Sequence, residues 1–189
     1  MKKVKKAVPK IEERSSVKFS FFKGGVVLKG KEYDEYIVDM IVRAIDFGFD
    51  YDDATLLFDP NFTLKFLDIK SLTRRKNLKD VRARVIGTGG KAMHTIENLS
   101  GGVVALQDNT FGLIVDADHL DSAVQAIESL VRGAKHGNVF AYLEKQNVKR
   151  RHFDNDDLGL TEDAKKLGVD EGMIEDFEDD IEELELEDA

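Results

Sequence analysis

The sequence predicts an α+β fold, because apolar side chains recur along it with both helical and strand periods. Apolar residues spaced three and four apart indicate amphipathic helices over 36–45 and 120–131. Residues 62–72 alternate apolar and polar side chains as a half-buried strand does, and the apolar runs 103–107 and 111–117 predict two further strands. Helices and strands are therefore expected to share a core.

Charge divides the 189-residue chain into a mildly basic body and an acidic end. From Asp154 to Ala189 there are 17 acidic residues and two lysines, a charge of −15, which leaves +6 for residues 1–153. Such a body attracts phosphate, whereas the acidic end repels it. The sequence has no cysteine, no signal-peptide pattern and no apolar run long enough to cross a bilayer, so we expect a cytoplasmic protein without disulfides.

The N-terminal third is expected to hold an arm, a hairpin and two helices. Residues 1–18 are rich in lysine and lack a period, which predicts a flexible basic arm. A strand or short hairpin follows, with a glycine turn at 24–25, and leads into a helix that ends near Gly48. A second, short helix is expected to be capped by Asp52 and to end before Pro60.

Turn and capping residues predict where the elements of the second half begin and end. The basic stretch 73–80, TRRKNLKD, reads as a turn-like link. Residues 91–99 carry apolar side chains on one helical face, and Gly101 supplies the stop. The stretch 108–110, Asp-Asn-Thr, suits a tight hairpin turn, and Asp118 is the expected cap of the helix that follows.

The stretch VIGTGGKAM, residues 85–93, is a glycine turn of the kind that holds a dinucleotide, a nucleoside triphosphate or an RNA backbone. Residues 87–92 fit the dinucleotide pattern G-x-G-x-x-A, and Asp108 lies where a ribose-binding acid belongs. However, residues 80–84 carry three charges in five positions, where a dinucleotide fold needs an almost continuous apolar strand. The chain also offers too few strand–helix units for that fold.

A second glycine pattern, GVVLKGK at residues 25–31, matches the triphosphate-binding form G-x-x-x-x-G-K. Glu32 stands where that pattern needs a hydroxyl group for magnesium, and a carboxylate there repels phosphate. The Val-Val-Leu interior also favours a strand over an open loop. The sequence therefore argues against a triphosphate site at this position.

An RNA-binding G-x-x-G turn is the interpretation that fits Gly87–Gly90 best. Glycine at both ends lets a nucleic-acid backbone approach closely, and the following helix presents unpaired amides and its positive dipole end to phosphate. Arg82, Arg84 and Lys91 add attraction for phosphate. A short helix over 80–86 is expected to carry both arginines into solvent.

One continuous stretch, RARVIGTGGKAMHTIENLSGGVVALQDNTFGLIVDADHLDSAVQAIESLVRGAKHGNVFAYLE, resembles a KH domain. In detail it resembles the second KH domain of the small-subunit ribosome-assembly family that includes the partner-of-Nob-one protein, Krr-one and archaeal counterparts. The features that carry the likeness are V-I-G-x-x-G-K-x-x-x-x-I-E, the strand-turn-strand, the A-x-x-A-I-x-x-L helix and the closing GAKHGNVFAYLE. Upstream, IVRAIDFGFDYDDATLLF resembles the link between that family's tandem KH domains, so the likeness spans Val26 to Glu144.

The resemblance implies a type I KH domain, a three-stranded antiparallel sheet packed on three helices, preceded by a partial, degenerate first KH domain. The implied division of the chain is a flexible basic arm at 1–18, the partial first KH domain with linking helices at 19–60, the KH domain with a C-terminal extension at 61–147, and an acidic, disordered tail at 148–189. The space before Val26 is too short for the front half of a first KH domain, so only its rear strands and last helix are expected.

The function that the resemblance implies is to hold single-stranded small-subunit rRNA near its 3′ end, alongside the endonuclease that trims that end. A KH groove takes about four unpaired nucleotides, with the glycine turn on phosphates and an apolar wall against bases. Ile86, Met93 and Val104 are each expected to line that wall or to belong to the core. The expected RNA-binding residues are Gly87, Thr88, Gly89, Gly90, Lys91, Ile86, Arg82, Arg84, His94, Arg74, Arg75 and Lys76.

Catalysis and cofactors are not expected. Of the 37 carboxylates, 17 lie in the tail, where a disordered chain cannot hold the geometry of acid–base chemistry, and the histidines lack metal-ligand spacing. The alternative function is a protein-interaction adaptor in pre-ribosomes, in which the glycine turn is vestigial and the acidic tail recruits a basic partner.

Overall fold

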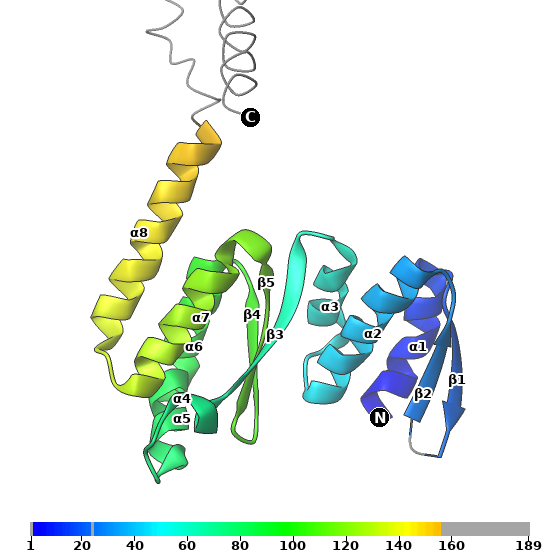
Figure 1. The fold of residues 1–189 in the computed structure, drawn as a ribbon, viewed down its shortest axis with the longest axis horizontal. Helices are drawn as coiled ribbons and strands as arrows, with labels where there is room; N and C mark the ends of the chain where they lie inside the picture. The colour runs from blue at the N-terminus through cyan, green and yellow to red at the C-terminus, as the bar shows by residue number, and fades with distance from the viewer. Residues whose placement is uncertain (1, 24, 156–189) are drawn as a thin grey trace, which may run out of the picture. The chain divides into compact units, whose positions relative to one another are not determined.

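The computed structural model describes residues 2–23 and 25–155, and residues 2–146 belong to one compact unit (Figure 1). In chain order the elements are α1 (Lys2–Arg14), β1 (Lys18–Phe22), β2 (Gly25–Lys29), α2 (Glu32–Phe47), α3 (Tyr51–Ala54), β3 (Phe62–Asp68), α4 (Ile69–Leu72), α5 (Leu78–Ile86), α6 (Lys91–Ser100), β4 (Val103–Gln107), β5 (Thr110–Asp116), α7 (Ala117–Arg132) and α8 (His136–Asn155), with 3-10 turns at Thr55–Phe58 and Thr88–Gly90. The fold is α+β, as expected. No helix of the described ranges is long and apolar enough to cross a membrane.

The second half is a three-stranded antiparallel sheet of order β3-β5-β4 with helices on one face. The central strand β5 pairs with β3 from Phe62↔Asp116 to Asp68↔Thr110, and with β4 from Val103↔Ile114 to Gln107↔Thr110. One face of the sheet packs against α5, α6 and α7. The largest fully buried side chains of the core between them include Phe111, Ile96, Ile127 and Leu130. The order of elements is that of a type I KH domain.

The opposite face of this sheet packs against the N-terminal half. Ile114 belongs to the core formed by α1, α2 and the chain that follows α2. At Gly112 an added Cβ atom would lie 2.7 Å from the ring of Phe47 and 2.8 Å from the ring of Phe49. Only glycine admits these rings so close to the strand. The sheet is therefore covered on both faces, with a separate hydrophobic core on each.

The expected flexible arm over residues 1–18 is wrong, because residues 2–14 form helix α1. Val4, Ala7 and Ile11 lie on one helical face and are buried in the N-terminal core. The sequence did not predict this helix, because Pro9 argues against one and the many lysines make the three- and four-residue apolar spacing hard to recognise. Burial of the apolar face outweighs the cost of Pro9 inside the helix.

The hairpin and the long helix of the N-terminal half repeat elements of the second half at a constant offset of 85 residues. Helix α2 and its final Gly48 correspond to α7 and its final Gly133. The hairpin β1–β2 corresponds to β4–β5, and each has a two-residue turn. Glu12 accepts a hydrogen bond from the Phe19 amide at 3.1 Å, as Glu97 does from the Val104 amide at 3.0 Å. The N-terminal half thus contains the rear part of a KH fold, and β2 corresponds to the central strand β5.

Several predicted boundaries shift by a few residues. The strand expected over 62–72 ends at Asp68, whose side chain caps α4 by accepting from the Lys70 amide. Asp116, in place of Asp118, caps α7 and accepts from the Asp118 amide at 2.9 Å. Asp50, in place of Asp52, precedes the short helix α3. The expected tail at 148–189 begins inside α8, and 156–189 lies outside the described residues.

Candidate nucleic-acid interface

The glycine turn lies between α5 and α6 and is built from left-handed backbone. Gly87, Gly89 and Gly90 have φ angles of 76°, 62° and 79°, and Gly87 combines its positive φ with an extended ψ of 174°. Glycine alone adopts such angles without strain. A bond of 3.2 Å from the Gly90 amide to the Gly87 carbonyl oxygen closes the turn.

The outer part of the turn is open to a ligand. A Cβ atom added to Gly89 or to Gly90 would meet no heavy atom within 4 Å, and Thr88 and Lys91 are exposed. No side chain caps the start of α6. The Lys91 amide donates to the Thr88 carbonyl oxygen, and no side chain accepts from the other amides of the first turn, which lie at the positive end of the helix dipole. This is a site where an anion can bind main-chain donors.

A cavity of about 630 Å³ lies beside the turn, between α5, the start of α6 and the first turns of α8. The side chains that line it from α8 are His136 and Phe140, whose ring centroids are 6.0 Å apart. His136 Nε2 lies 2.8 Å from the carbonyl oxygen of Arg84 and so ties α8 to the end of α5. Sequence reasoning missed both residues, although they stand in the quoted stretch GAKHGNVFAYLE.

Arg82 and Arg84 are not free in solvent, which corrects the expectation for both. The Arg82 guanidinium donates to the Asp108 carbonyl oxygen at 3.2 Å and to the Asn109 side chain. Arg84 Nη2 donates to the Gly133 carbonyl oxygen at 3.0 Å and to that of Ala134. Their acceptors lie 26 or more residues away in the chain, so local sequence does not reveal them. Both arginines brace the fold around the turn.

The remaining expected RNA-binding residues divide by exposure. Lys91 is exposed at the start of α6, and His94, also exposed, lies one turn further along and contacts Glu97 at 3.3 Å. The three basic residues of the link, 74–76, are all exposed. The Arg75 guanidinium lies close to Gly133, where an added Cβ atom would meet its Nη2 at 2.8 Å. The structure thus places exposed positive charge at the turn and in the link before α5.

Of the three residues expected in the apolar wall, one is part of the core and two are half-buried. Val104 is buried and belongs to the core between the sheet and its helices. Met93 is half-buried and packs against that core, and Ile86 is half-buried at the end of α5. Val104 therefore supports the site from inside, and the half-buried pair remains available to contact bases.

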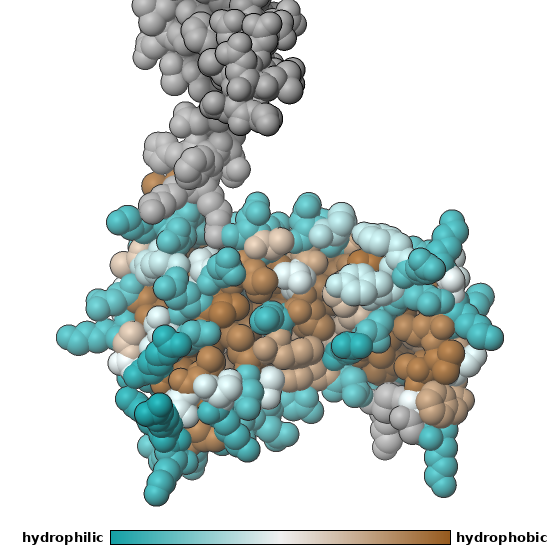
Figure 2. Space-filling model, in the orientation of Figure 1, coloured by the Kyte–Doolittle hydropathy of each residue, from teal (hydrophilic) through white to brown (hydrophobic). Residues whose placement is uncertain are grey.

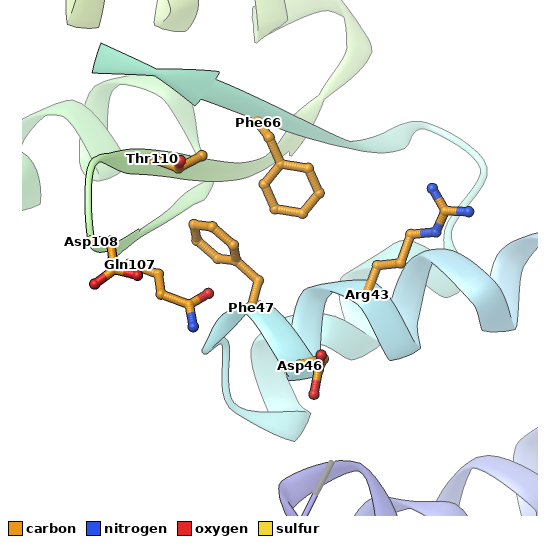
Figure 3. Close-up of a pocket in the computed structure, with 7 residues that line it drawn as sticks. All are labelled: Arg43, Asp46, Phe47, Phe66, Gln107, Asp108 and Thr110. Atoms are coloured by element: carbon orange, nitrogen blue, oxygen red, sulfur yellow. The ribbon is translucent and has the colours of Figure 1, made fainter. Parts of the chain in front are cut away.

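A second cavity, of about 460 Å³, lies on the other side of the sheet (Figure 3). Phe47 from α2 and Phe66 from β3 face each other there, with ring centroids 4.7 Å apart. Asp46 and Asp108 line the cavity, and their carboxylates repel phosphate. The glycine turn contributes nothing to this cavity, so we do not assign RNA binding to it. Among the residues described, no three His, Asp or Glu side chains converge to hold a metal ion.

Comparison with known proteins supports the reading of the fold. A family model for the second KH domain of PNO1, described as a eukaryotic type KH domain (KH-domain type I), matches residues 63–148. A KH domain-containing protein of Methanocaldococcus jannaschii is 34% identical over 149 residues, which are 77% of this chain and 62% of the relative. The pre-rRNA-processing protein pno1 of Schizosaccharomyces pombe is 31% identical over 131 residues, 67% of this chain and 51% of the relative. The chain thus spans about half to three-fifths of these relatives.

Solved structures with the same fold come from two archaea. Dim2p of Pyrococcus horikoshii OT3 superposes with a TM-score of 0.68 at 28% identity, covering 74% of this chain and 87% of that one. A chain in the a/eIF2α–aDim2p–rRNA complex of the same organism gives a TM-score of 0.69 at 27% identity, covering 76% and 84%. A protein of unknown function from Aeropyrum pernix gives a TM-score of 0.71 at 26% identity, covering 78% and 84%.

Proposed function

Because this chain belongs to the PNO1/Dim2 family of KH-domain proteins, we propose that it is a non-catalytic RNA-binding factor of small-subunit ribosome assembly. The observation that carries the proposal is the open outer half of the glycine turn. Gly89 and Gly90 leave free space above the backbone, and the uncapped start of α6 presents its amides beside that space. A phosphodiester strand can therefore approach main-chain donors that a side chain would otherwise cover.

Positive charge and apolar contacts favour a single nucleic-acid strand. Lys91 and the exposed basic residues 74–76 supply positive charge for phosphates on either side of the turn. Ile86 and Met93 are half-buried and offer apolar contacts to bases that are splayed out of a helix. A duplex hides its bases, so the site favours unpaired nucleotides. The related rRNA complex and the pre-rRNA-processing relatives support rRNA as the ligand.

The finer part of the proposal is that the bound segment lies near the 3′ end of the small-subunit rRNA, in the cytoplasm, alongside the endonuclease that trims this end. The resemblance of the whole second half to a PNO1 KH domain supports this placement. It predicts that an oligonucleotide from the 3′ end binds more tightly than one of equal length and base composition from elsewhere in the same rRNA.

The test is to place two carboxylates on the turn in the variant Thr88→Asp with Gly89→Asp. Aspartate tolerates left-handed backbone, so the fold should persist, and circular dichroism would verify it. Repulsion of phosphate should weaken binding of a single-stranded 3′-end fragment by at least about tenfold, measured by fluorescence anisotropy. Lys65→Glu is the matched control, because it changes the net charge equally on β3, at the sheet edge opposite β4.

Unchanged affinity in a folded double variant would refute the groove and favour the adaptor alternative, in which the turn is vestigial. An equal loss in Lys65→Glu would show that only net charge matters. Equal affinity for the 3′-end fragment and the matched fragment would retain RNA binding but remove the 3′-end assignment.

A further inference from the structure

The cavity of about 460 Å³ at the end of α2 combines aromatic rings with carboxylates, and the proposed RNA site does not use it. Phe47 and Phe66 form its apolar part. In Figure 3 their rings lie close together, with Gln107 and Asp108 on one side of them. The volume lies in the range of small-ligand sites. The cavity is therefore large enough to hold a ligand group.

The strand register explains why the two rings meet here. Phe66 of β3 lies opposite Gly112 of the central strand β5, and Gly112 lies opposite Ala105 of β4. Residues directly opposite each other in antiparallel strands point to the same face, which here is the face that packs on the N-terminal core. Gly112 has no side chain, so the Phe47 ring occupies the space above it and lies 4.7 Å from the Phe66 ring, centroid to centroid. Two strands and helix α2 thus hold the aromatic part in place.

The rings are only partly covered. Phe66 is 38% exposed and Phe47 is half-buried. Figure 2 shows apolar, brown surface over β3 and β5, with hydrophilic, teal residues around it. Three polar residues that line the cavity, Asp46, Gln107 and Asp108, are exposed. Apolar surface beside exposed charged groups suits a ligand that has both an apolar stem and a charged head.

The charge around the cavity is negative. Asp108 stands in the β4–β5 turn, and no hydrogen bond or ion pair within residues 2–23 and 25–155 engages its carboxylate. Asp46 belongs to the last turn of α2, which contains no basic residue, and the carbonyl end of a helix is itself partly negative. Arg43 also lines the cavity, but its Nε lies 2.7 Å from Asp39 Oδ2, and this ion pair compensates its charge. The cavity therefore favours a cation.

Rings and carboxylates together favour arginine over the other cations of proteins. A guanidinium group is planar, so it stacks on an aromatic face and also donates to a carboxylate through two parallel N–H groups. The ammonium group of lysine is a compact, strongly hydrated charge and lacks this fork. The methylene groups of arginine pack on apolar surface such as an exposed ring. Nucleic acid does not meet these conditions, because the carboxylates repel phosphate.

We propose that this cavity binds an arginine side chain of a basic partner protein. The guanidinium group stacks on the exposed Phe66 ring and donates to the Asp108 carboxylate, and the methylene groups contact the Phe47 ring. The main chain of the partner stays outside the cavity. The glycine turn contributes nothing to this cavity, so the arginine and an RNA strand bind at separate sites. An arginine buried in this way commonly contributes much of the affinity of a protein interface.

The first experiment titrates the full chain with a blocked pentapeptide that has one arginine between glycines, and follows the protein by NMR. The ring signals of Phe47 and Phe66 and the amide signal of Asp108 should shift and saturate, whereas the amide signals of Gly89 and Gly90 should stay. A lysine peptide should bind at least about threefold more weakly, because it lacks the planar fork. A citrulline peptide, which keeps the shape of arginine without its charge, should bind about tenfold more weakly.

The second experiment removes one contact at a time. Asp108→Asn keeps a side chain of similar size that tolerates the φ of 51° at this position, and it should weaken binding of the arginine peptide about two- to fivefold. Phe66→Leu keeps an apolar side chain without the ring and should weaken binding by a similar factor of about two to five. Asp121→Asn, exposed on α7, changes the net charge as Asp108→Asn does and should keep the native affinity. Circular dichroism would verify that each variant is folded.

Several outcomes would overturn the proposal. They are the absence of shifts at the two rings, equal affinity of the arginine and citrulline peptides, and native affinity in either Asp108→Asn or Phe66→Leu. Spermidine that binds at the same signals as tightly as the arginine peptide would assign the cavity to a polyamine. Ring shifts caused by single-stranded RNA would assign it to nucleic acid. A dimer in sedimentation whose dissociation shifts the same ring signals would assign it to a second copy of this chain.

Discussion

A Cβ atom added to Gly87 would lie 2.6 Å from the Cβ atom of Ala92, far inside the contact distance of two carbon atoms. Gly87 thus allows the chain to fold back tightly between α5 and α6. Gly89 and Gly90 have a different role, because nothing lies within 4 Å of an added Cβ atom at either position. One glycine closes the turn, and the other two keep its outer side accessible.

Gly87→Ala is expected to destabilise the protein by about 2 to 4 kcal/mol, because strained backbone and overpacking each cost about 1 to 3 kcal/mol. Gly89→Ala, in open left-handed backbone, should cost only about 1 to 2 kcal/mol. Urea unfolding followed by circular dichroism measures both. Equal losses in the two variants would contradict the separate roles of these glycines.

Much of the fold could be predicted because its strongest signals are local. The helical spacing in α2 and α7 and the alternation in β3 predict these elements without tertiary information. The consecutive glycines likewise identify the turn. The roles of Arg82 and Arg84 could not be predicted, because their acceptors come from the β4–β5 turn and the end of α7. Helix α1 could not be predicted either, because its stability depends on burial against residues that are distant in the sequence.

Ile11→Ala tests whether α1 is part of the core. The Ile11 side chain is fully buried, and replacement of a buried isoleucine by alanine costs about 2 to 5 kcal/mol. A flexible arm would tolerate the change without loss. Glu13→Ala, at an exposed position of the same helix, should leave the free energy of unfolding almost unchanged. Urea unfolding of both variants measures the difference, and equal stabilities would show that α1 is not packed.

Arg84→Met is expected to lower stability by about 1.5 to 3 kcal/mol, because two carbonyl oxygens at the end of α7 lose a charged donor. RNA affinity of the folded variant should remain close to that of the native chain. Arg74→Met, at an exposed position, is the stability control. A loss of RNA affinity in Arg84→Met without a loss of stability would show that Arg84 contacts RNA.

Lys91→Met, unlike Arg84→Met, is expected to weaken RNA binding and to leave stability unchanged. Lys91 is exposed at the glycine turn, so its removal should leave the free energy of unfolding almost unchanged. If it neutralises one phosphate, the slope of log affinity against log salt should fall by about 0.7, the value for one contact to a single strand. Anisotropy titrations across a salt series measure the slope. An unchanged slope would place Lys91 outside the contact surface.

Asp53 gives the protein a predictable dependence of stability on pH. Burial in α3, followed by the nearby carboxylate of Asp50 and those of Glu97 and Asp52, raises the pKa of Asp53 above its ordinary value of 3.8. The folded state therefore binds this proton more tightly than the unfolded state does. The stability contributed by the protonated form is present below the ordinary pKa and is lost as pH rises through the raised value.

Asp53→Asn removes the charge and keeps a side chain of similar shape, so the variant should be more stable than the native protein at neutral pH. The difference should shrink as pH falls toward and below 3.8, where the native aspartate becomes protonated in both states. Urea unfolding at a series of pH values measures it, and Asp121→Asn on the exposed surface of α7 is the control. A difference that stays constant with pH would show that packing or hydrogen bonding, and not charge, determines the effect.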